Sequence, residues 1–273
     1  MKDIEIADLR KLAELVKDKY QYDFSNYAMS SFKRRISRIM ELYNLSFEGL
    51  IKKLNFEKDF VENFLTEITV NVTEMFRDPS FWVLLKKEII PSILLNHKTF
   101  KIWHAGCSSG EEVFSMCIVL KELGIHEGIN IIATDIDTKI LENAKAGRYS
   151  LKNMEINEKN YIQYHRSGSL KDYYKVKDGQ AVMDPDLLKN VSFRKHDLVL
   201  GDVFNKFDLV LCRNVMIYFN QNLQNVVLSK LHGSLFKYGY LAIGTKESLI
   251  WCDVANKFIV VNNEEKVYKN IKD

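Results

Sequence analysis

Residues 104–112 read His104-Ala105-Gly106-Cys107-Ser108-Ser109-Gly110-Glu111-Glu112, and this loop decides the fold. It follows a short apolar run at 100–103, and apolar residues at helical spacing continue from Glu111 to Leu123. Small residues between a strand and a helix let the backbone approach a ligand at the helix N-terminus. We therefore expect an α/β domain in which Gly106 lies beside a bound cofactor.

The same alternation of strand and helix continues towards the C-terminus. Apolar runs that predict strands occur at 100–103, 129–134, 191–193, 207–212 and 240–243, and helical patterns occur at 111–123, 138–146 and 221–235. Strands that alternate with helices predict βαβ units around a mainly parallel, Rossmann-like sheet. Two further runs, 258–261 and 266–269, flank Asn262-Asn263-Glu264-Glu265 and predict an antiparallel hairpin at the C-terminus.

Two other parts accompany this domain. Residues 1–67 show helical spacing only, as at Phe32, Ile36 and Ile39, and predict an all-α N-terminal domain. Residues 68–99 connect it to the cofactor domain at 100–273. An insert at about 148–190 contains Asp178-Gly179 between alternating residues, which is a strong hairpin signal, and we interpret the insert as a small β subdomain.

Composition excludes several classes of protein. Of 273 residues, 47% are hydrophobic and 27% charged, as in a globular protein, and a net charge of +3 gives no argument for nucleic acid. Four cysteines without CxxC or Cys/His spacing favour a reduced compartment and no metal site. The N-terminus lacks the order of a signal peptide, and the apolar stretch Ile89–Leu95 is too short for a membrane span. We therefore expect a cytoplasmic protein.

The glycine loop argues against a dinucleotide. Three residues separate Gly106 from Gly110, so the GxGxxG fingerprint is absent. Glu111 and Glu112 would repel a pyrophosphate, whereas they suit a ligand with a cationic end, such as the amino and sulfonium groups of S-adenosylmethionine. The alternative is that both belong to a first helical turn, where the helix dipole favours acidic residues.

Polar residues follow three further strands. Asp135 ends the second strand, where it can accept hydrogen bonds from ribose hydroxyls, and Asp137 is a candidate helix cap. Asp197 follows the third strand and either accepts from the adenine amino group or caps a turn. The fourth strand runs into Cys212-Arg213-Asn214-Val215-Met216-Ile217-Tyr218-Phe219. Its polar members predict a site, because ligands gather at the carboxyl ends of parallel strands. These members are Arg213, Asn214 and Tyr218.

Two groups of basic residues allow alternative interpretations. Arg77, next to Phe76, either binds a carboxylate bidentately or forms a surface salt bridge. Four cations also cluster along one predicted helix, where they form either a solvated face or a docking surface for a partner. They are Lys33, Arg34, Arg35 and Arg38.

Four segments occur in order along the chain: Thr69-Val70-Asn71-Val72-Thr73-Glu74-Met75-Phe76-Arg77-Asp78, Ala105-Gly106-Cys107-Ser108-Ser109-Gly110-Glu111-Glu112, Ala133-Thr134-Asp135-Ile136-Asp137 and Cys212-Arg213-Asn214-Val215-Met216-Ile217-Tyr218-Phe219. Together they closely resemble the CheR family, the chemotaxis receptor glutamate O-methyltransferases, over nearly the whole chain. The resemblance implies an enzyme that uses S-adenosylmethionine to methylate glutamate side chains of methyl-accepting chemotaxis receptors. It also implies S-adenosylhomocysteine as the second product.

The resemblance further implies cofactor contacts from Asn71, Thr73, Arg77, Glu111, Asp135, Asp197, Leu198, Arg213 and Asn214. Tyr218 would lie near the transferred methyl group, and the basic helix would dock the acidic methylation helices of a receptor. The chain departs from the family pattern at Asp197, where Asn is usual, and at Thr245-Lys246, where His-Ser is usual. Other members grip a receptor's tethering peptide by strand addition to the β subdomain, but the tight hairpin at Asp178-Gly179 favours no such dependence here.

We expect Arg77 and Tyr218 to be the catalytic residues. A glutamate carboxylate is ionised at neutral pH, so the acceptor needs no strong general base, and catalysis would depend on positioning and on exclusion of water. Two rival functions stay open. A nicotinamide-dependent oxidoreductase would share the fold but should carry GxGxxG, and a non-catalytic cofactor sensor would need the pocket without needing Arg77 and Tyr218.

Overall fold

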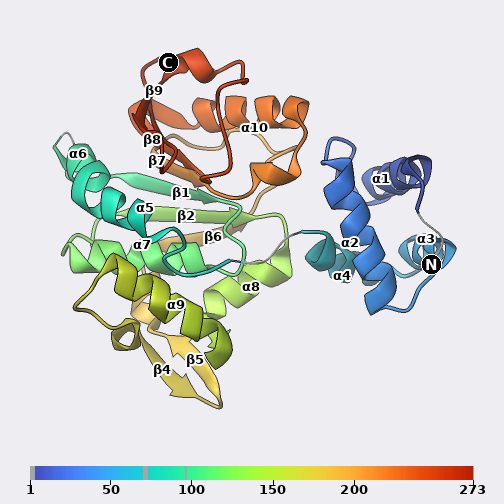
Figure 1. Ribbon diagram of the computed structural model, residues 1–273, viewed down its shortest axis with the longest axis horizontal. Helices are drawn as coiled ribbons and strands as arrows, with labels where there is room; N and C mark the ends of the chain where they lie inside the picture. The colour runs from blue at the N-terminus through green and yellow to red at the C-terminus, as the bar shows by residue number, and fades with distance from the viewer. Residues whose placement is uncertain (1–3, 70–72, 96, 273) are drawn as a thin grey trace.

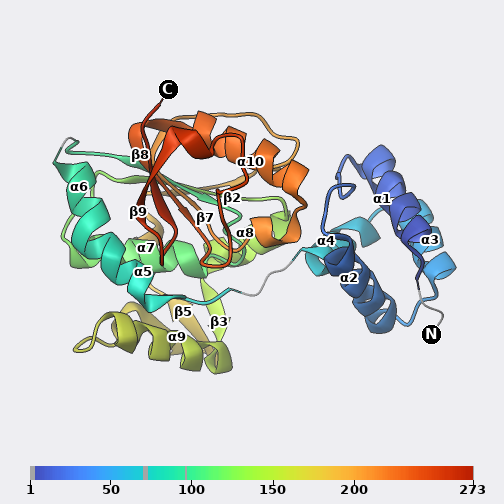
Figure 2. The ribbon, with the colours of Figure 1, turned by 45° about the horizontal axis from the view of Figure 1, so that its top comes forward.

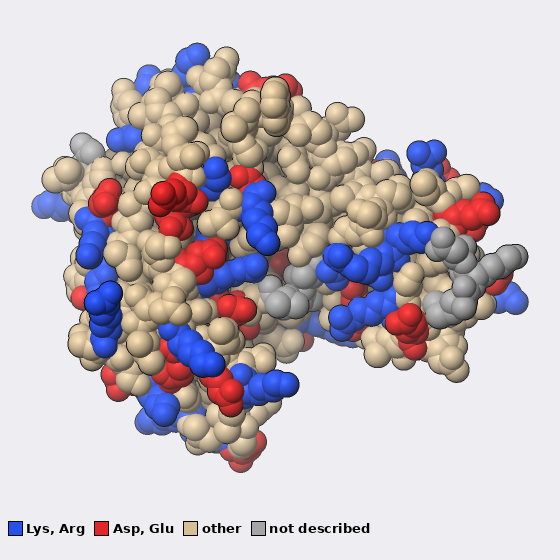
Figure 3. All heavy atoms as spheres, in the orientation of Figure 1, with Lys and Arg blue, Asp and Glu red and all other residues tan. Residues whose placement is uncertain are grey.

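The computed structural model describes residues 4–69, 73–95 and 97–272. Its N-terminal part is helical and consists of α1 (Ile6–Tyr20), α2 (Met29–Leu42), α3 (Phe47–Phe56) and α4 (Phe60–Ile68). These helices enclose a core of their own, formed by residues such as Leu12, Phe32 and Phe64. They stand beside the α/β domain as a distinct body, so the predicted all-α domain is confirmed (Figures 1 and 2). Basic side chains gather on its face in the area of α2 (Figure 3).

A seven-stranded sheet forms the centre of the second domain. Its strands are β1 (Lys101–Ala105), β2 (Asn130–Asp135), β6 (Val191–Lys195), β7 (Phe207–Cys212), β8 (Leu235–Ile243), β9 (Phe258–Asn262) and β10 (Val267–Asn270). They are ordered β6-β2-β1-β7-β8-β10-β9. The first five are parallel, and β10 is antiparallel to both of its neighbours. The predicted fold class, a mainly parallel sheet with an antiparallel hairpin at the C-terminus, is therefore confirmed.

Helices cover both faces of the sheet. On one face lies α10 (Gln221–Gly233); on the other lie α7 (Glu111–Glu122) and α8 (Thr138–Ala146), as Figure 1 shows. The connecting segment at 68–99 contains α5 (Pro79–Leu84), a π-helical turn (Leu85–Ile89) and α6 (Ile90–Leu94). Short 3-10 turns occur at Leu170–Tyr173, Pro185–Leu188, Met216–Tyr218 and Ala255–Lys257. Each face has its own apolar core, so the sheet is buried on both sides, as expected for parallel strands.

Local chemistry explains where the helices beside the site begin and end. Helix α7 starts after Gly110, whose φ of 90° suits glycine, and an added Cβ there would lie only 2.9 Å from the Cβ of Ala144. Helix α8 starts at Asp137, whose carboxylate accepts from the backbone N–H groups of Lys139 and Ile140. The alternative role of Asp137 as a helix cap is therefore confirmed.

The predicted β subdomain is confirmed, and the structure shows it as a three-stranded antiparallel sheet, ordered β3-β5-β4, from β3 (Arg148–Ser150), β4 (Tyr174–Lys177) and β5 (Gln180–Met183). Asp178 and Gly179 form its turn with φ values of 49° and 72°, so the predicted hairpin is confirmed. The insert also contains α9 (Leu151–Tyr164), which the sequence did not predict. The buried face of α9 carries asparagines and tyrosines, so the apolar periodicity that usually identifies a helix is weak.

Candidate functional site

A cavity opens at the carboxyl ends of β1, β2, β6 and β7 and is bounded on its other side by the helical domain. It encloses about 1120 Å³ of space, part of which is open to solvent. The strand order reverses between β1 and β7, and ligands bind at this point in open α/β sheets. Residues from the helical domain that line the cavity are Tyr27, Ser31, Phe32, Arg35, Ile68 and Thr69.

The glycine loop after β1 brings backbone to the cavity wall. Gly106 has a φ of 79°, and an added Cβ would lie 2.7 Å from Cγ2 of Val215. The N–H groups of Gly106 and Cys107 donate to the carbonyl of Thr134, which holds the loop against the end of β2. Glycine is required at position 106 because its φ is positive and because the Val215 side chain fills the space that a Cβ would need.

Asp135 lies at the end of β2 and lines the same cavity. Its carboxylate is 8% exposed and accepts backbone hydrogen bonds from Ser108 (2.9 Å) and Asp137 (3.1 Å). Burial raises the pKa of Asp135 to about 6, against these hydrogen bonds, which favour the ionised form. Each carboxylate oxygen can accept more than one hydrogen bond, so Asp135 keeps acceptor capacity for a ligand hydroxyl.

The two glutamates at the start of α7 face different surroundings. Glu112 lines the cavity, whereas Glu111 is not among the lining residues. Glu111 is 4% exposed and accepts from the Ser109 hydroxyl (2.6 Å), and burial raises its pKa to about 7. Although burial alone would raise the pKa of Glu112, its hydrogen bond with His104 and the charge of Arg213 hold that pKa below its ordinary value. The structure therefore presents a charged Glu112 to the cavity. The sequence suggested both glutamates for this role, and the family resemblance implied Glu111.

Asp197 and Leu198, after β6, both line the cavity. One oxygen of Asp197, Oδ1, accepts from the N–H groups of Val199 (2.7 Å) and Leu200 (3.2 Å). Within the part of the chain that the structure describes, Oδ2 has no hydrogen-bond partner. The turn-capping alternative is therefore confirmed for one oxygen, and the other stays available as an acceptor.

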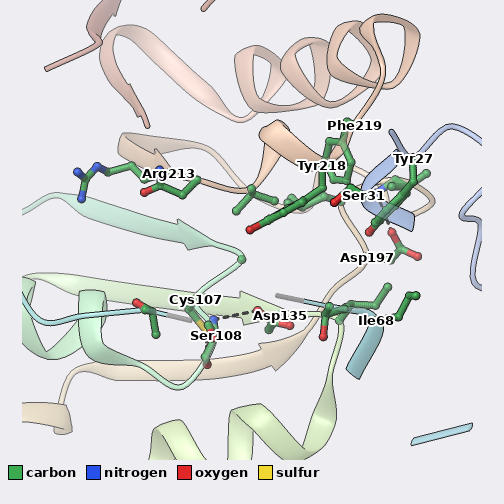
Figure 4. A pocket seen from close by; sticks show the side chains of 18 of the residues that line it. Tyr27, Ser31, Ile68, Cys107, Ser108, Asp135, Asp197, Arg213, Tyr218 and Phe219 are labelled. Carbon is green, nitrogen blue, oxygen red and sulfur yellow. Dashed lines mark hydrogen bonds between the residues drawn. The ribbon is translucent and has the colours of Figure 1, made fainter. Parts of the chain in front are cut away.

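Arg213, after β7, lines the cavity, but its guanidinium points away from the other labelled side chains (Figure 4). It pairs with Asp78 (2.6 Å) and Glu112 (3.4 Å) and lies 4.1 Å from the centre of the Phe81 ring. Its side chain is only 2% exposed. The Arg213 guanidinium is thus paired within the protein: it orients Glu112, and through Asp78 it holds the start of α5 against the end of β7.

Asn214 and Tyr218 belong to the loop that follows. Asn214 has a φ of 60°, and its N–H donates to the buried carboxylate of Glu247, which also accepts from Ile217. The Tyr218 side chain lines the cavity, and the Arg35 guanidinium lies 5.5 Å from the centre of its ring. Burial raises the pKa of Tyr218, against the charges of Arg35 and Arg77, so its hydroxyl is protonated at neutral pH.

The predicted cationic residues are divided between the cavity and the outer surface. Arg77 and Arg35 line the cavity, and Arg35 also donates to the carbonyls of Glu67 (3.3 Å) and Thr69 (3.5 Å). Arg34 and Arg38 are exposed on the outer face of α2, and Lys33 is partly buried. Thr73 also lines the cavity, whereas Asn71 lies outside the described residues.

A short strap joins the two domains at the cavity. The loop before α2 pairs with the segment after β7: the N–H of Ala28 donates to the carbonyl of Tyr218 (2.8 Å), and the N–H of Asn220 donates to the carbonyl of Asn26 (2.9 Å). Between these bonds the rings of Tyr27 and Phe219 pack edge to face at 5.2 Å. The strap therefore places Tyr27 directly beside the Tyr218 loop.

Comparison with known proteins matches both domains. The CheR methyltransferase SAM binding domain matches residues 71–267, and the CheR methyltransferase all-alpha domain matches residues 7–69. This chain belongs to the CheR family of methyltransferases. The resemblance seen in the four sequence motifs is confirmed by these matches.

Curated relatives cover almost the same length. The chain is 38% identical to the putative methyltransferase Cher3 of Pseudomonas putida, over 98% of this chain and 97% of the relative. It is 34% identical to a chemotaxis protein methyltransferase of Listeria innocua, over 90% and 93%. It is 31% identical to chemotaxis protein methyltransferase 1 of Pseudomonas aeruginosa, over 82% of each chain.

The cofactor of this CheR methyltransferase is S-adenosylmethionine, and the residues present fit it. Gly106 brings backbone to the cavity wall, and Asp135 offers acceptors that suit the two ribose hydroxyls. Glu112 supplies a negative charge that suits the cationic methionine end, and this wall carries no pyrophosphate fingerprint. The sequence identified Glu111 and Glu112 as an acidic pair, but which of the two faces the cavity depends on the contacts of Glu112 with His104 and Arg213.

Two further searches concern residues 4–69, 73–95 and 97–272. Across these residues, His, Cys, Asp and Glu side chains form no group of three or more that could hold a metal ion. Across the same residues, no helix combines the length and the apolar character that crossing a bilayer requires.

Proposed function

We propose that this CheR methyltransferase transfers methyl groups to glutamate side chains of methyl-accepting chemotaxis receptors in the cytoplasm. One observation carries the choice of an anionic acceptor: Arg35 and Arg77 line the same cavity as Tyr218, and both lie close enough for their charges to act on its hydroxyl. A carboxylate entering the cavity there meets two cations and a protonated hydroxyl. Two of the curated relatives, from Listeria innocua and Pseudomonas aeruginosa, are named chemotaxis protein methyltransferases, which supports the same substrate.

In this methyl transfer the main task of the protein is to position the acceptor carboxylate and the cofactor. S-adenosylmethionine supplies an electrophilic methyl group when bound and leaves as S-adenosylhomocysteine. A glutamate carboxylate is already ionised at neutral pH, so it attacks without a general base and becomes a methyl ester. In the proposed site Tyr218 donates a hydrogen bond that orients the acceptor and Arg77 attracts its charge, while the bound cofactor and acceptor displace water from the cavity.

The outer face of α2 is the proposed docking surface for the receptor. Arg34 and Arg38 lie on this face, four residues apart, and the side chain of Arg38 is 72% exposed. Lys33 precedes them, and basic side chains gather in this area (Figure 3). Receptor helices that carry several glutamates present the opposite charge, which steers encounter more than it adds affinity. Arg35, inside the cavity, would link this helix to Tyr218.

The proposal is tested by labelled methyl transfer from S-adenosylmethionine to receptor-containing membranes. We expect label that is released as methanol by mild base, because a glutamate methyl ester is base-labile and a methylated lysine is not. The matched control is the Asp135→Ala variant, which should transfer much less label at a limiting cofactor concentration because it binds the cofactor more weakly. Label that resists base, or label that never reaches the receptor, would contradict the proposed substrate.

A further inference from the structure

Tyr27 is a cavity residue that no motif assigns. It belongs to the loop between α1 and α2, and its ring packs edge to face against Phe219 (5.2 Å) and Phe24 (4.9 Å). Within the described ranges, its hydroxyl makes no hydrogen bond. A partly buried phenol usually finds a polar partner, so an unpaired hydroxyl directed into a ligand cavity points to a group on the ligand.

The neighbours of this hydroxyl identify the end of the cavity that it faces. Figure 4 shows the Tyr27 hydroxyl directed towards Asp197, while Asp135 lies farther along the cavity. Burial raises the pKa of Tyr27, and the charges of Asp197 and Asp135 raise it further, so the hydroxyl carries its proton. Tyr27 is thus a hydrogen-bond donor at the end of the cavity where Asp197 lies.

Asp197 supplies the complementary acceptor. Its Oδ1 is used by the backbone of Val199 and Leu200, and its Oδ2 has no partner within the described residues. Tyr27 and Asp197 are not hydrogen-bonded to each other there, so one donor and one acceptor face the cavity side by side. The edge of an adenine ring presents an amino donor next to a ring-nitrogen acceptor, which is the matching pattern.

We propose that Tyr27 of the helical domain and Asp197 of the α/β domain together recognise the adenine of the cofactor, with Asp197 accepting from the amino group and Tyr27 donating to a ring nitrogen. The inference concerns the cofactor and stands whether or not a chemotaxis receptor is the methyl acceptor. It also gives a physical meaning to Asp197 in place of the usual Asn. An amide can donate as well as accept, whereas an ionised carboxylate only accepts, so the donor must come from another residue.

The strap between the domains makes this contact possible. The hydrogen bonds from Ala28 to Tyr218 and from Asn220 to Asn26 lie on either side of Tyr27 and fix its backbone against the α/β domain. The edge-to-face contact with Phe219 then fixes the direction of the ring. Because the same strap holds Tyr218, adenine recognition and acceptor orientation depend on one arrangement of the two domains.

The test is calorimetric binding to the Tyr27→Phe variant, which keeps the ring and removes the hydroxyl. We expect roughly three- to tenfold weaker binding of S-adenosylhomocysteine, the effect of one lost hydrogen bond. We expect the same loss with 5′-methylthioadenosine, which keeps the adenosine and lacks the amino acid. The matched control is Tyr22→Phe in the same loop. The hydroxyl of Tyr22 accepts from Lys195, and Tyr22 does not line the cavity, so its removal should leave cofactor affinity unchanged.

A double-mutant cycle makes the pairing with Asp197 explicit. In an Asp197→Asn background the new amide can donate to the ring nitrogen, so removing the Tyr27 hydroxyl should cost less than it does in the wild type. Unchanged affinity of Tyr27→Phe for both ligands, with an unchanged melting temperature, would overturn the inference. A loss confined to S-adenosylhomocysteine would also overturn it, because the hydroxyl would then contact the methionine half.

Discussion

The two walls of the cavity differ in how the chain builds them. On the α/β wall, Gly106, Asp135 and Asp197 each follow a parallel strand, and strand ends meet at one edge of the sheet. On the helical wall, Tyr27 and Arg35 reach the cavity only because two domains dock. The order of strands and loops along the chain determines which residues line the first wall, and contacts between the domains determine which residues line the second. A substitution on the cofactor wall should therefore affect only the contact of that residue, whereas the position of the helical wall depends on the strap between the domains.

The largest expected effect concerns the first wall. Replacing Asp135 with alanine removes hydrogen bonds to a charged acceptor, each worth about 1.5 to 3 kcal/mol. We expect S-adenosylhomocysteine to bind roughly ten- to a hundredfold more weakly, measured by calorimetry. The circular dichroism spectrum should stay that of the folded wild type. Equal affinity of the variant and the wild type would show that Asp135 does not bind the cofactor, and would contradict the assignment of the α/β wall to the cofactor.

The same residue predicts a pH dependence of cofactor binding. The pKa of Asp135 is raised to about 6 in the folded protein, so the carboxylate is ionised at pH 8 and largely protonated at pH 5. If the ionised form binds the ribose, affinity for S-adenosylhomocysteine falls by about tenfold between pH 8 and pH 5, because one pH unit below the pKa about one tenth is ionised. Calorimetry at several pH values measures this fall. Asp135→Ala should flatten the profile, and an equally steep profile in that variant would assign the titration to another group.

The smallest expected effect concerns the outer surface of the helical domain. Reversing Arg34 and Arg38 to glutamate should raise the apparent KM for receptor several-fold, because rim charges act mainly on encounter. Affinity for S-adenosylhomocysteine should stay unchanged, since neither residue lines the cavity. The wild-type rate should also fall with added salt, which screens exposed charges. A methylation rate that changes neither with salt nor with the charge reversal would mean that this face of α2 is a solvated surface and does not dock the receptor.

Much of the α/β domain could be predicted from the sequence. The strand at 207–212 and the helix at 138–146 have the predicted boundaries, because each is a continuous apolar or amphipathic segment with a clear start. Strand β8 starts at Leu235 instead of 240, since the exposed Lys237 and Tyr238 interrupt the apolar run that identifies a buried strand. Helix α9 was missed because Asn157 and Asn160 on its buried face bond with the backbone at Met75. Such partners lie about 80 residues away in the sequence, where local periodicity carries no information.

The sequence contains a pattern that distinguishes Arg35 from the other cations of α2, and the sequence interpretation did not use it. Arg35 lies three residues after Phe32 and four before Ile39, so it shares the side of α2 that faces the core. Arg34 and Arg38 lie farther from the core side, where the structure exposes them, and Arg38 pairs with Glu67 (3.5 Å). Helical spacing thus distinguishes Arg35, nearest the core, from the more exposed Arg34 and Arg38. The contact of Arg35 with Tyr218, however, depends on domain docking and could not be predicted.

The central claim is that the two walls form one methyl-transfer site, and Tyr218→Phe tests it most directly. Tyr218 joins the walls, since its backbone takes part in the strap and its side chain lines the cavity. A group that orders the acceptor is used mostly in the transition state, so its loss lowers turnover more than binding. As a contrast, Arg77→Ala should weaken both turnover and cofactor affinity.

The measurement is the turnover of receptor methylation by Tyr218→Phe beside its calorimetric affinity for S-adenosylhomocysteine. We predict that affinity stays within a few-fold of the wild type while turnover falls by about tenfold or more, which corresponds to about 1.4 kcal/mol of activation free energy. A variant that methylates the receptor at the wild-type rate would contradict the role of Tyr218 and, with it, the claim that the two walls act as one site.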